Sequence, residues 1–183
     1  TAGSSAVGAK IEVGYFSIGL FTSKVHMKDF KLYNPAGFPN EPMVNIPEIR
    51  VDYDVPAFLS GKIHAPLVVF NLKEMTVIKN KDGKLNVDSL KVIEEQKAAA
   101  DKKGDKKAPQ AQTKQMPIQI DILKLNVERV IFKDYTKGEG LPAVQVFEVD
   151  LKNKEFKNIK SVQQMITLVL LHAMGPTAAQ SAG

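Results

Sequence analysis

The fold is decided by one stretch of the sequence, Ile118-Gln119-Ile120-Asp121-Ile122-Leu123-Lys124-Leu125-Asn126-Val127. Apolar and polar residues alternate along it with a period of two, which is typical of a β-strand with one buried face. The alternation changes phase between Ile122 and Leu123, so that the apolar residues move from even to odd positions. A phase change of one residue usually marks a β-bulge, which twists a sheet. The stretch therefore predicts a twisted, half-buried strand.

The same alternation recurs on both sides of this stretch. We expect further strands from residue 11 and over 25–32, 43–53, 63–70, 72–79, 130–135 and 144–151. Phase slips at Asp29 and at Pro47 predict further bulges, and Pro66 predicts an edge strand or a bulge. Residues 55–61 are expected to form a short helical or looped connector, and Gly83 a tight turn with positive φ. Asp88 can cap a helix that runs to about residue 100.

Ser161 with Gln164 resembles a capping box at the start of a helix. Around it the C-terminal part changes to helical spacing, with apolar residues at Ile159, Val162, Ile166, Val169 and Leu170. A helix that is apolar nearly all round is buried against something. We therefore expect it to pack on the sheet or on a partner, and we take these five residues as candidates for docking that partner.

The expected class is mainly β with a few helices, namely a curved, groove-like antiparallel sheet with this apolar helix. We divide the chain into a flexible N-terminal segment (1–9), a β unit with a connecting helix (10–100), a Lys-rich flexible linker (101–116), a continuation of the sheet (117–152), the C-terminal helix (153–176) and a loose tail (177–183). Because the chain starts at Thr1 rather than Met, we expect that a signal peptide or anchor was removed.

Charge and composition exclude several classes of function. The net charge is +5, but six lysines and two acids lie within residues 97–114, so one short segment carries most of the excess. No basic stripe for nucleic acid is indicated. The lysines are read as a solvated loop, with anionic lipid headgroups or an acidic partner as alternatives. The absence of cysteine excludes thiol catalysis and disulfides.

The sequence holds no recognisable catalytic or metal-binding motif. His26, His64 and His172 have no metal-type partner three or four residues away, and we expect them to be surface or hydrogen-bonded structural residues. No nucleophile elbow, phosphate loop or zinc-protease motif is present. We therefore predict a protein that is not an enzyme and that needs neither cofactor nor metal.

The order of motifs between residues 10 and 90 resembles the N-terminal unit of the AsmA family of bacterial envelope proteins. The resemblance rests on residues 16–21, on Val25-His26-Met27-Lys28-Asp29-Phe30-Lys31-Leu32-Tyr33-Asn34-Pro35-Ala36-Gly37-Phe38, on 46–51, on Leu59-Ser60-Gly61-Lys62-Ile63 and on the turn Asp82-Gly83-Lys84-Leu85-Asn86. It implies a periplasmic, inner-membrane-associated protein whose curved sheet carries phospholipid along an apolar trough, tethered by an N-terminal anchor that precedes Thr1. A late-embryogenesis-abundant-like (WHy-type) sandwich is a weaker alternative, based on residues 32–35.

The aliphatic stripe of the sheet is the candidate binding surface. Its candidate residues are Ile49, Val51, Tyr53, Ile118, Ile120, Ile122, Val144 and Val146. Two interpretations stay open: the stripe is an ordinary core sealed by the helices, or it is a trough that binds or transfers lipid. A third hypothesis is a structural or assembly subunit of an envelope complex, in which open strand edges and the C-terminal helix bind envelope proteins or further copies of the chain.

Overall fold

The computed structural model describes residues 8–90, 118–136, 140–161, 164–165, 168–169 and 171–172. The strands are β1 (Ile11–Glu12), β2 (Tyr15–Gly19), β3 (Lys24–Tyr33), β4 (Pro42–Asp52), β5 (Ile63–Lys79), β6 (Ile118–Asp134) and β7 (Ala143–Ile159). The helices are α2 (Val55–Leu59) and the short 3-10 helix η1 (Val87–Ser89). The predicted class, mainly β with few helices, is confirmed for the part of the chain that the structure describes.

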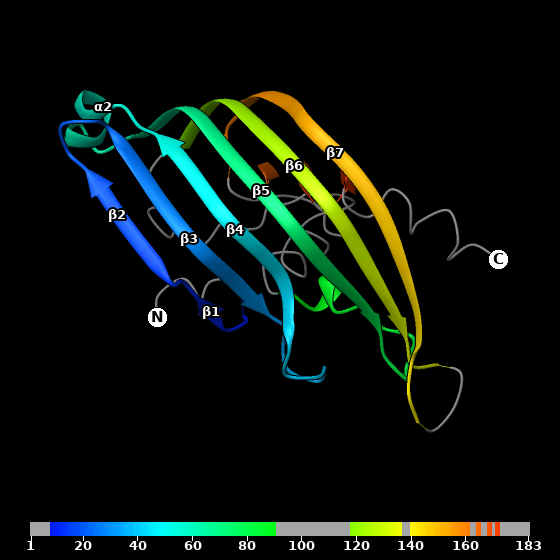
Figure 1. The fold of residues 1–183 in the computed structure, drawn as a ribbon. Helices are drawn as coiled ribbons and strands as arrows, with labels where there is room; N and C mark the ends of the chain where they lie inside the picture. The colour runs from blue at the N-terminus through cyan, green and yellow to red at the C-terminus, as the bar shows by residue number, and fades with distance from the viewer. Residues whose placement is uncertain are drawn as a thin grey trace, which may run out of the picture.

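All seven strands belong to one open sheet with the order β1-β3-β4-β5-β6-β7, and β2 pairs with β3 beside β1 (Figure 1). Neighbours are antiparallel except β5 and β6, which are parallel from the pair Ile63–Ile118 to the pair Lys79–Asp134. The prediction of an entirely antiparallel sheet is therefore wrong at this pair. Parallel neighbours need a crossover of about a dozen residues or more, which the long segment between β5 and β6 provides. One sheet also means that the WHy-type sandwich is wrong.

The strands are longer than the sequence suggested. Residues 63–79 form one strand of 17 residues, and so do residues 118–134, although we expected two strands in each. The predicted C-terminal helix over 153–176 is wrong at its start, because β7 continues to Ile159. In the first two places an alternation that changed phase was taken for the end of a strand, and in the third the helical spacing that begins at Ile159 was extended back to residue 153.

Most of these phase changes lie on one line across the sheet. The core residues are three apart rather than two in β4 (Ile46, Ile49), β5 (Leu72, Met75) and β6 (Val127, Val130). At the same level on β3, Asp29 has a positive φ of 53°. The register between β3 and β4 is the same before and after Asp29, so the predicted bulge at Asp29 and Pro47 is instead a matched bend of neighbouring strands.

A second bend crosses the other half of the sheet. Core residues are again three apart in β5 (Ala65, Val68) and β6 (Ile120, Leu123). Pro66 lies between the two in β5, beyond the last pair that β5 makes with β4, at Leu67. Its missing N–H therefore costs no ladder hydrogen bond, although β5 is a central strand and not the edge strand that Pro66 predicted.

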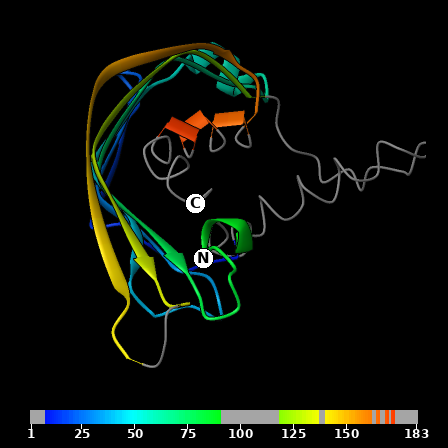
Figure 2. The same ribbon diagram turned by 90° about the vertical axis from the view of Figure 1, so that its right-hand side faces the viewer.

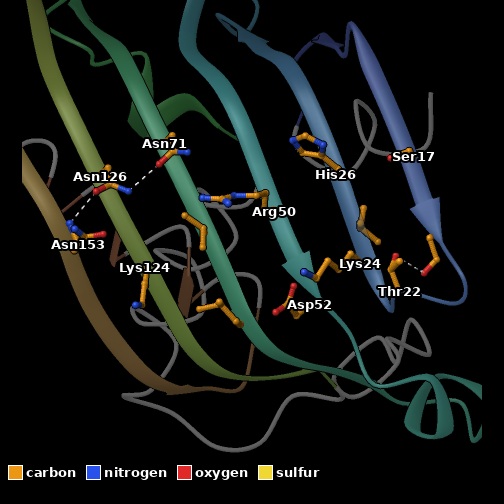
Figure 3. Close-up of a pocket in the computed structure, with 14 residues that line it drawn as sticks. Ser17, Thr22, Lys24, His26, Arg50, Asp52, Asn71, Lys124, Asn126 and Asn153 are labelled. Carbon is orange, nitrogen blue, oxygen red and sulfur yellow. Dashed lines mark hydrogen bonds between the residues drawn. The ribbon is translucent and has the colours of Figure 1, made fainter.

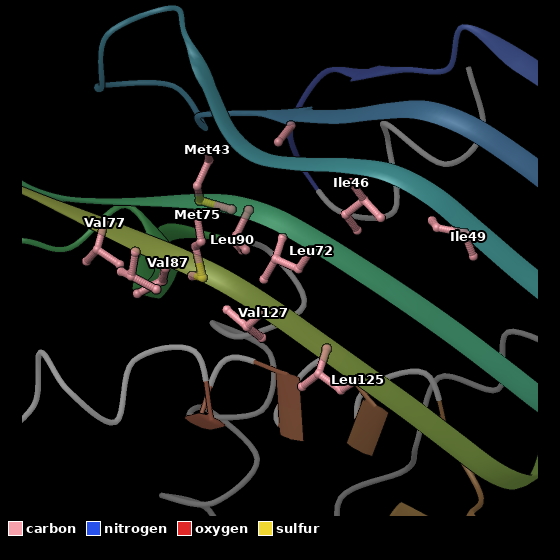
Figure 4. Close-up of a cluster of buried hydrophobic side chains, with 12 residues drawn as sticks. Met43, Ile46, Ile49, Leu72, Met75, Val77, Val87, Leu90, Leu125 and Val127 are labelled. Atoms are coloured by element: carbon pink, nitrogen blue, oxygen red, sulfur yellow. The ribbon is translucent and has the colours of Figure 1, made fainter. Parts of the chain in front are cut away.

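The two bends curve the sheet, and the core lies on its concave side. Figure 2 shows the curved sheet, with η1 and the helical residues near the C-terminus inside the curve. The main buried cluster combines residues of β4, β5 and β6 with Val87 and Leu90, as Figure 4 shows. Because one face of every long strand contributes to this cluster, the concave face is apolar and the outer face is left to polar side chains.

The connection after β5 is fixed by a buried asparagine. Asn86 is fully buried; its Oδ1 accepts from the backbone N–H of Ile78 and of Val87, both at 2.9 Å. Its Nδ2 donates to Thr76 O at 2.8 Å and to Asn34 Oδ1 at 2.7 Å. The Asp-Gly-x-x-Asn turn and the Tyr-Asn-Pro segment, which lie far apart in the sequence, are thus joined directly.

The predicted turn at Gly83, the connector at 55–61 and the cap at Ser161 are present. Gly83 has a φ of 77° in the turn after β5, and the connector at 55–61 contains α2, whose N-cap Asp54 accepts from Ala57 N at 3.1 Å. Ser161 Oγ accepts from Gln164 N at 3.0 Å, as the capping box at this position requires. The helix expected from Asp88 to residue 100 is wrong at its start, because Asp88 lies inside η1, whose N-cap is Asn86, and Leu90 after it is extended. The remainder of that predicted helix lies outside the described residues.

Candidate functional site

The candidate site is the apolar groove on the concave face of the sheet, a cavity of about 280 Å³. All of its lining side chains are apolar, and we call this set the concave groove: Ile11, Met27, Phe30, Leu32, Met43, Val44, Ile46, Ile49, Phe70, Leu72, Leu90, Leu125, Met165 and Val169. They come from β1, from β3 to β6, from the residue after η1 and from the C-terminal helical residues. A groove built this way offers contact to hydrocarbon and no charge to a polar substrate.

Half of the predicted groove residues lie on the concave face. Ile49 lines the concave groove and Val51 packs against both buried clusters. Ile118 and Ile120 belong to the second cluster, beyond the end of the cavity. The sequence correctly placed these four residues on the apolar side of the sheet.

The other four predicted groove residues lie elsewhere. Ile122 pairs with Leu67, which borders a depression on the outer face, because the bend between Ile120 and Leu123 reverses the alternation. Val144 and Val146 are 54% and 53% exposed and belong to neither buried cluster.

Tyr53 lies at the end of the sheet. Its ring packs edge-on against Phe58, with 6.5 Å between ring centroids, and its hydroxyl donates to Gly19 O at 3.4 Å. Predicting which side chains reach the groove thus failed wherever a bend or a strand end intervened.

The predicted docking residues divide into three groups. Ile159 is fully buried in β7 and is a core residue, so its assignment to a partner-binding helix is wrong. Val169 lines the concave groove from a helical position. Val162, Ile166 and Leu170 lie outside the described residues. The exposure of Val169 to the groove, rather than to solvent, favours packing of this segment on the sheet of its own chain.

Sequence reasoning missed most of the lining residues. Met43, Val44 and Ile46 precede the bend at Pro47 and lie on the same face as Ile49, which follows it. The signal that could have found them is the change of phase itself, interpreted as continuation of one face across a bend. Met165 carries no such signal, because only packing brings a distant helical residue onto the sheet.

The outer face carries a row of polar side chains that crosses five strands. His26 Nε2 contacts Glu48 Oε1 at 2.7 Å, and Asn71 Nδ2 donates to Glu48 Oε2 at 3.2 Å. Asn126 Nδ2 donates to Asn71 Oδ1 at 2.8 Å, and Asn126 Oδ1 accepts from Asn153 N at 2.8 Å (Figure 3). The hydrogen bond with His26 is the largest cause that lowers the pKa of Glu48 below its ordinary value. This row borders a depression of about 760 Å³. Because its side chains are hydrogen-bonded from one strand to the next, they connect β3 to β7 and stabilise the sheet.

His64 joins α2, β5 and β6 at one end of the sheet. Its Nδ1 lies 3.1 Å from Asp54 Oδ2 and its Nε2 lies 2.9 Å from Asp121 Oδ2. Only the doubly protonated ring can donate to both carboxylates at once. The hydrogen bond with Asp121 is the largest cause that raises the pKa of His64 above 6.5, and the contact with His64 is the largest cause that lowers the pKa of Asp121. As predicted, the described histidines have structural hydrogen-bond partners.

We expect a titration of the His64 ring by NMR to give a pKa above 6.5, its ordinary value. Since the folded pKa is raised, the contribution of His64 to stability is complete below 6.5 and is lost as the pH rises through the folded pKa. The lowered pKa of Asp121 adds a contribution present above 3.8 and lost as the pH falls through its folded pKa. Asp121→Asn should lower the His64 pKa, whereas Glu128→Gln, an exposed acid further along β6, should leave it unchanged. An unshifted wild-type pKa contradicts this prediction.

No helix within the described residues is long and apolar enough to cross a bilayer, and these residues contain no group of three or more His, Asp or Glu side chains placed to hold a metal ion. Comparison of the chain with protein-family models, with curated proteins and with solved structures finds no match in any of the three.

Proposed function

We propose that this chain is a non-enzymatic, AsmA-like protein of the Gram-negative envelope, periplasmic and associated with the inner membrane, that binds or transfers lipid through its concave groove. The observation that carries the proposal is a cavity lined by apolar side chains alone, on the concave side of an open sheet. The resemblance of residues 10–90 to the AsmA unit supports the compartment and the ligand class.

The size of the groove limits what it encloses. Its volume of about 280 Å³ lies just below the roughly 300–1,000 Å³ of small-ligand pockets. A single hydrocarbon chain fits such a space, whereas a whole phospholipid does not. We therefore propose that the groove holds one acyl chain of a lipid at a time and leaves the headgroup outside.

Replacing Val44 by Phe tests the groove directly. Val44 lines the cavity and is half-buried, so the larger ring occupies the space that an acyl chain would take. We expect the affinity for a fluorescent fatty acid to fall about tenfold or more, the equivalent of ~1.4 kcal/mol of lost contact. Equilibrium fluorescence titration measures the effect, and thermal unfolding verifies that the variant is folded.

The matched control is Val146→Phe, the same substitution on β7 at a valine that is 53% exposed and in neither buried cluster. It should bind the fatty acid like wild type. Native mass spectrometry of protein purified without detergent should in addition show phospholipid bound to wild type. Absence of both bound lipid and fatty-acid binding in wild type would sink the proposed function.

The alternative function, a structural or assembly subunit, is favoured by the open edges of the sheet. At one edge, β2 exposes Tyr15, Phe16 and Ile18, each more than half exposed, and at the other edge β7 pairs, among the described strands, with β6 alone. An unpaired edge can add a strand from another chain. Truncation after Lys160, which spares the buried Ile159, should abolish oligomers if the C-terminal helix joins copies, and sedimentation velocity decides the matter.

A further inference from the structure

Four large apolar side chains project from one end of the sheet. Leu20 and Phe21 lie in the turn between β2 and β3 and are 73% and 104% exposed, and Phe58 and Leu59 end α2 and are 58% and 81% exposed. Single exposed apolar residues are normal, but a group of them marks an interaction site. We call these four side chains the apolar tip.

The tip is one structural unit, although its two halves are distant in sequence. Tyr53 N donates to Ser23 O at 2.9 Å, which joins the turn to the end of β4. The Tyr53 ring packs edge-on against Phe58, with ring centroids 6.5 Å apart. Figure 1 shows the turn and α2 side by side at the same end of the sheet.

Basic residues flank the tip, and two acids lie beside it, Asp52, which pairs with Lys24 across β3 and β4, and Asp54. Residues 20–24 contain Lys24 and no acid, and residues 55–62 contain Lys62 and no acid. Lys62 and Lys160 border the same hollow beside α2. Asp54, the acid next to α2, caps the helix and contacts His64. The part of this end that projects furthest thus combines apolar and positive side chains.

The concave groove continues toward the tip. Phe16 pairs with Met27, a groove residue, and Ile18 pairs with Val25 two residues further along β3. Both side chains therefore share the concave face, yet they are 56% and 53% exposed. Apolar surface runs from the cavity along β2 to Leu20 without an intervening charge in residues 15–21.

We propose that the apolar tip docks on an anionic lipid bilayer, with its four side chains at the boundary between headgroups and acyl chains and with Lys24 and Lys62 against the headgroup phosphates. Aromatic and leucine side chains beside lysines are the composition of interfacial anchors. Two copies meeting tip to tip would instead bring like charges together. The inference extends the proposed function, because docking here places the open side of the groove near the lipid it would take up.

Co-sedimentation with vesicles tests the inference. The full chain should bind vesicles made of equal parts phosphatidylglycerol and phosphatidylcholine, and binding should weaken in high salt and on pure phosphatidylcholine. Leu20→Ser together with Phe21→Ser, and separately Phe58→Ser together with Leu59→Ser, should each reduce the partition coefficient about tenfold or more. The control is Leu141→Ser, which removes a leucine that is 98% exposed at the opposite end of the sheet and should change nothing.

The outcomes separate docking from groove binding. Tip variants should keep wild-type affinity for the fluorescent fatty acid in solution, and Val44→Phe should keep vesicle binding. A wild-type chain that binds vesicles but not the fatty acid contradicts the groove alone. A wild-type chain that does not bind anionic vesicles overturns the proposed docking, and so do tip variants that bind them like wild type. Tip variants that bind vesicles normally but lose self-association would show that the tip contacts another copy instead, which also overturns it.

Discussion

Asn86→Ala lowers the free energy of unfolding by about 4 kcal/mol, the largest effect that we expect from a single substitution in this chain. The Asn86 side chain makes four hydrogen bonds and is fully buried. Alanine leaves the backbone N–H of Ile78 and the carbonyl of Thr76 without these partners, away from water. Each such buried group costs about 1–3 kcal/mol, and the substitution also breaks the link to Asn34. Urea unfolding followed by circular dichroism measures the loss.

Asn126→Ala is the matched control for this prediction. Asn126 also makes two side-chain hydrogen bonds, to Asn71 and from the backbone of Asn153, but it is half-exposed on the outer face. Water can satisfy the groups that it leaves, so we expect a loss of about 1 kcal/mol. Equal losses at the two positions would contradict the assignment of Asn86 as the fixed point of the β5–η1 connection.

Leu123→Ala destabilises the fold by about 3 kcal/mol, within the range measured for leucine deletion in well-packed cores. Leu123 is fully buried and packs with Val68, Ile120 and Ile159 in the second cluster. Its cluster joins β5, β6 and β7, so the cavity left by the substitution would weaken the packing of all three strands. The change in the midpoint of urea unfolding at constant slope gives the value.

Leu141→Ala provides the reference, because Leu141 is 98% exposed in the connection between β6 and β7. It should alter stability by less than about 0.5 kcal/mol. If Leu123→Ala were as mild, Leu123 would face solvent, and the bend between Ile120 and Leu123 that turns it inward would be wrong.

The two faces of the sheet have different tasks, and this division underlies both proposals. Polar side chains on the outer face form cross-strand hydrogen bonds such as Asn71–Asn126. The concave face is apolar and leaves a cavity that its own chain lines from the sheet and from Met165 and Val169. The concave face is thus covered in part by helical residues but keeps a cavity, so it could be a sealed core or an open trough. Fatty-acid titration distinguishes the two, because only an open trough binds the ligand.

The sequence predicted the strands because alternation is a local property. A period of two needs only neighbouring residues to be visible, and the sequence follows it in the segments of β3, β4, β6 and β7 that lie between the bends. Local chemistry also predicted the turn at Gly83 and the capping of Gln164 N by Ser161. The apolar face, and with it Ile49 and Val51 as residues of that face, follows from the same alternation.

What the sequence alone determined is thus the extended character of the chain, the position of its turns and the apolar face of most strands, since each depends on residues a few positions apart. Tertiary structure alone decided that β5 and β6 run parallel, that Ile159 ends a strand, that Val144 and Val146 lie outside the core, and that Asn34 reaches Asn86. These features arise from pairing and packing between distant segments, whose free energy depends on the whole sheet and leaves no periodic trace in the sequence.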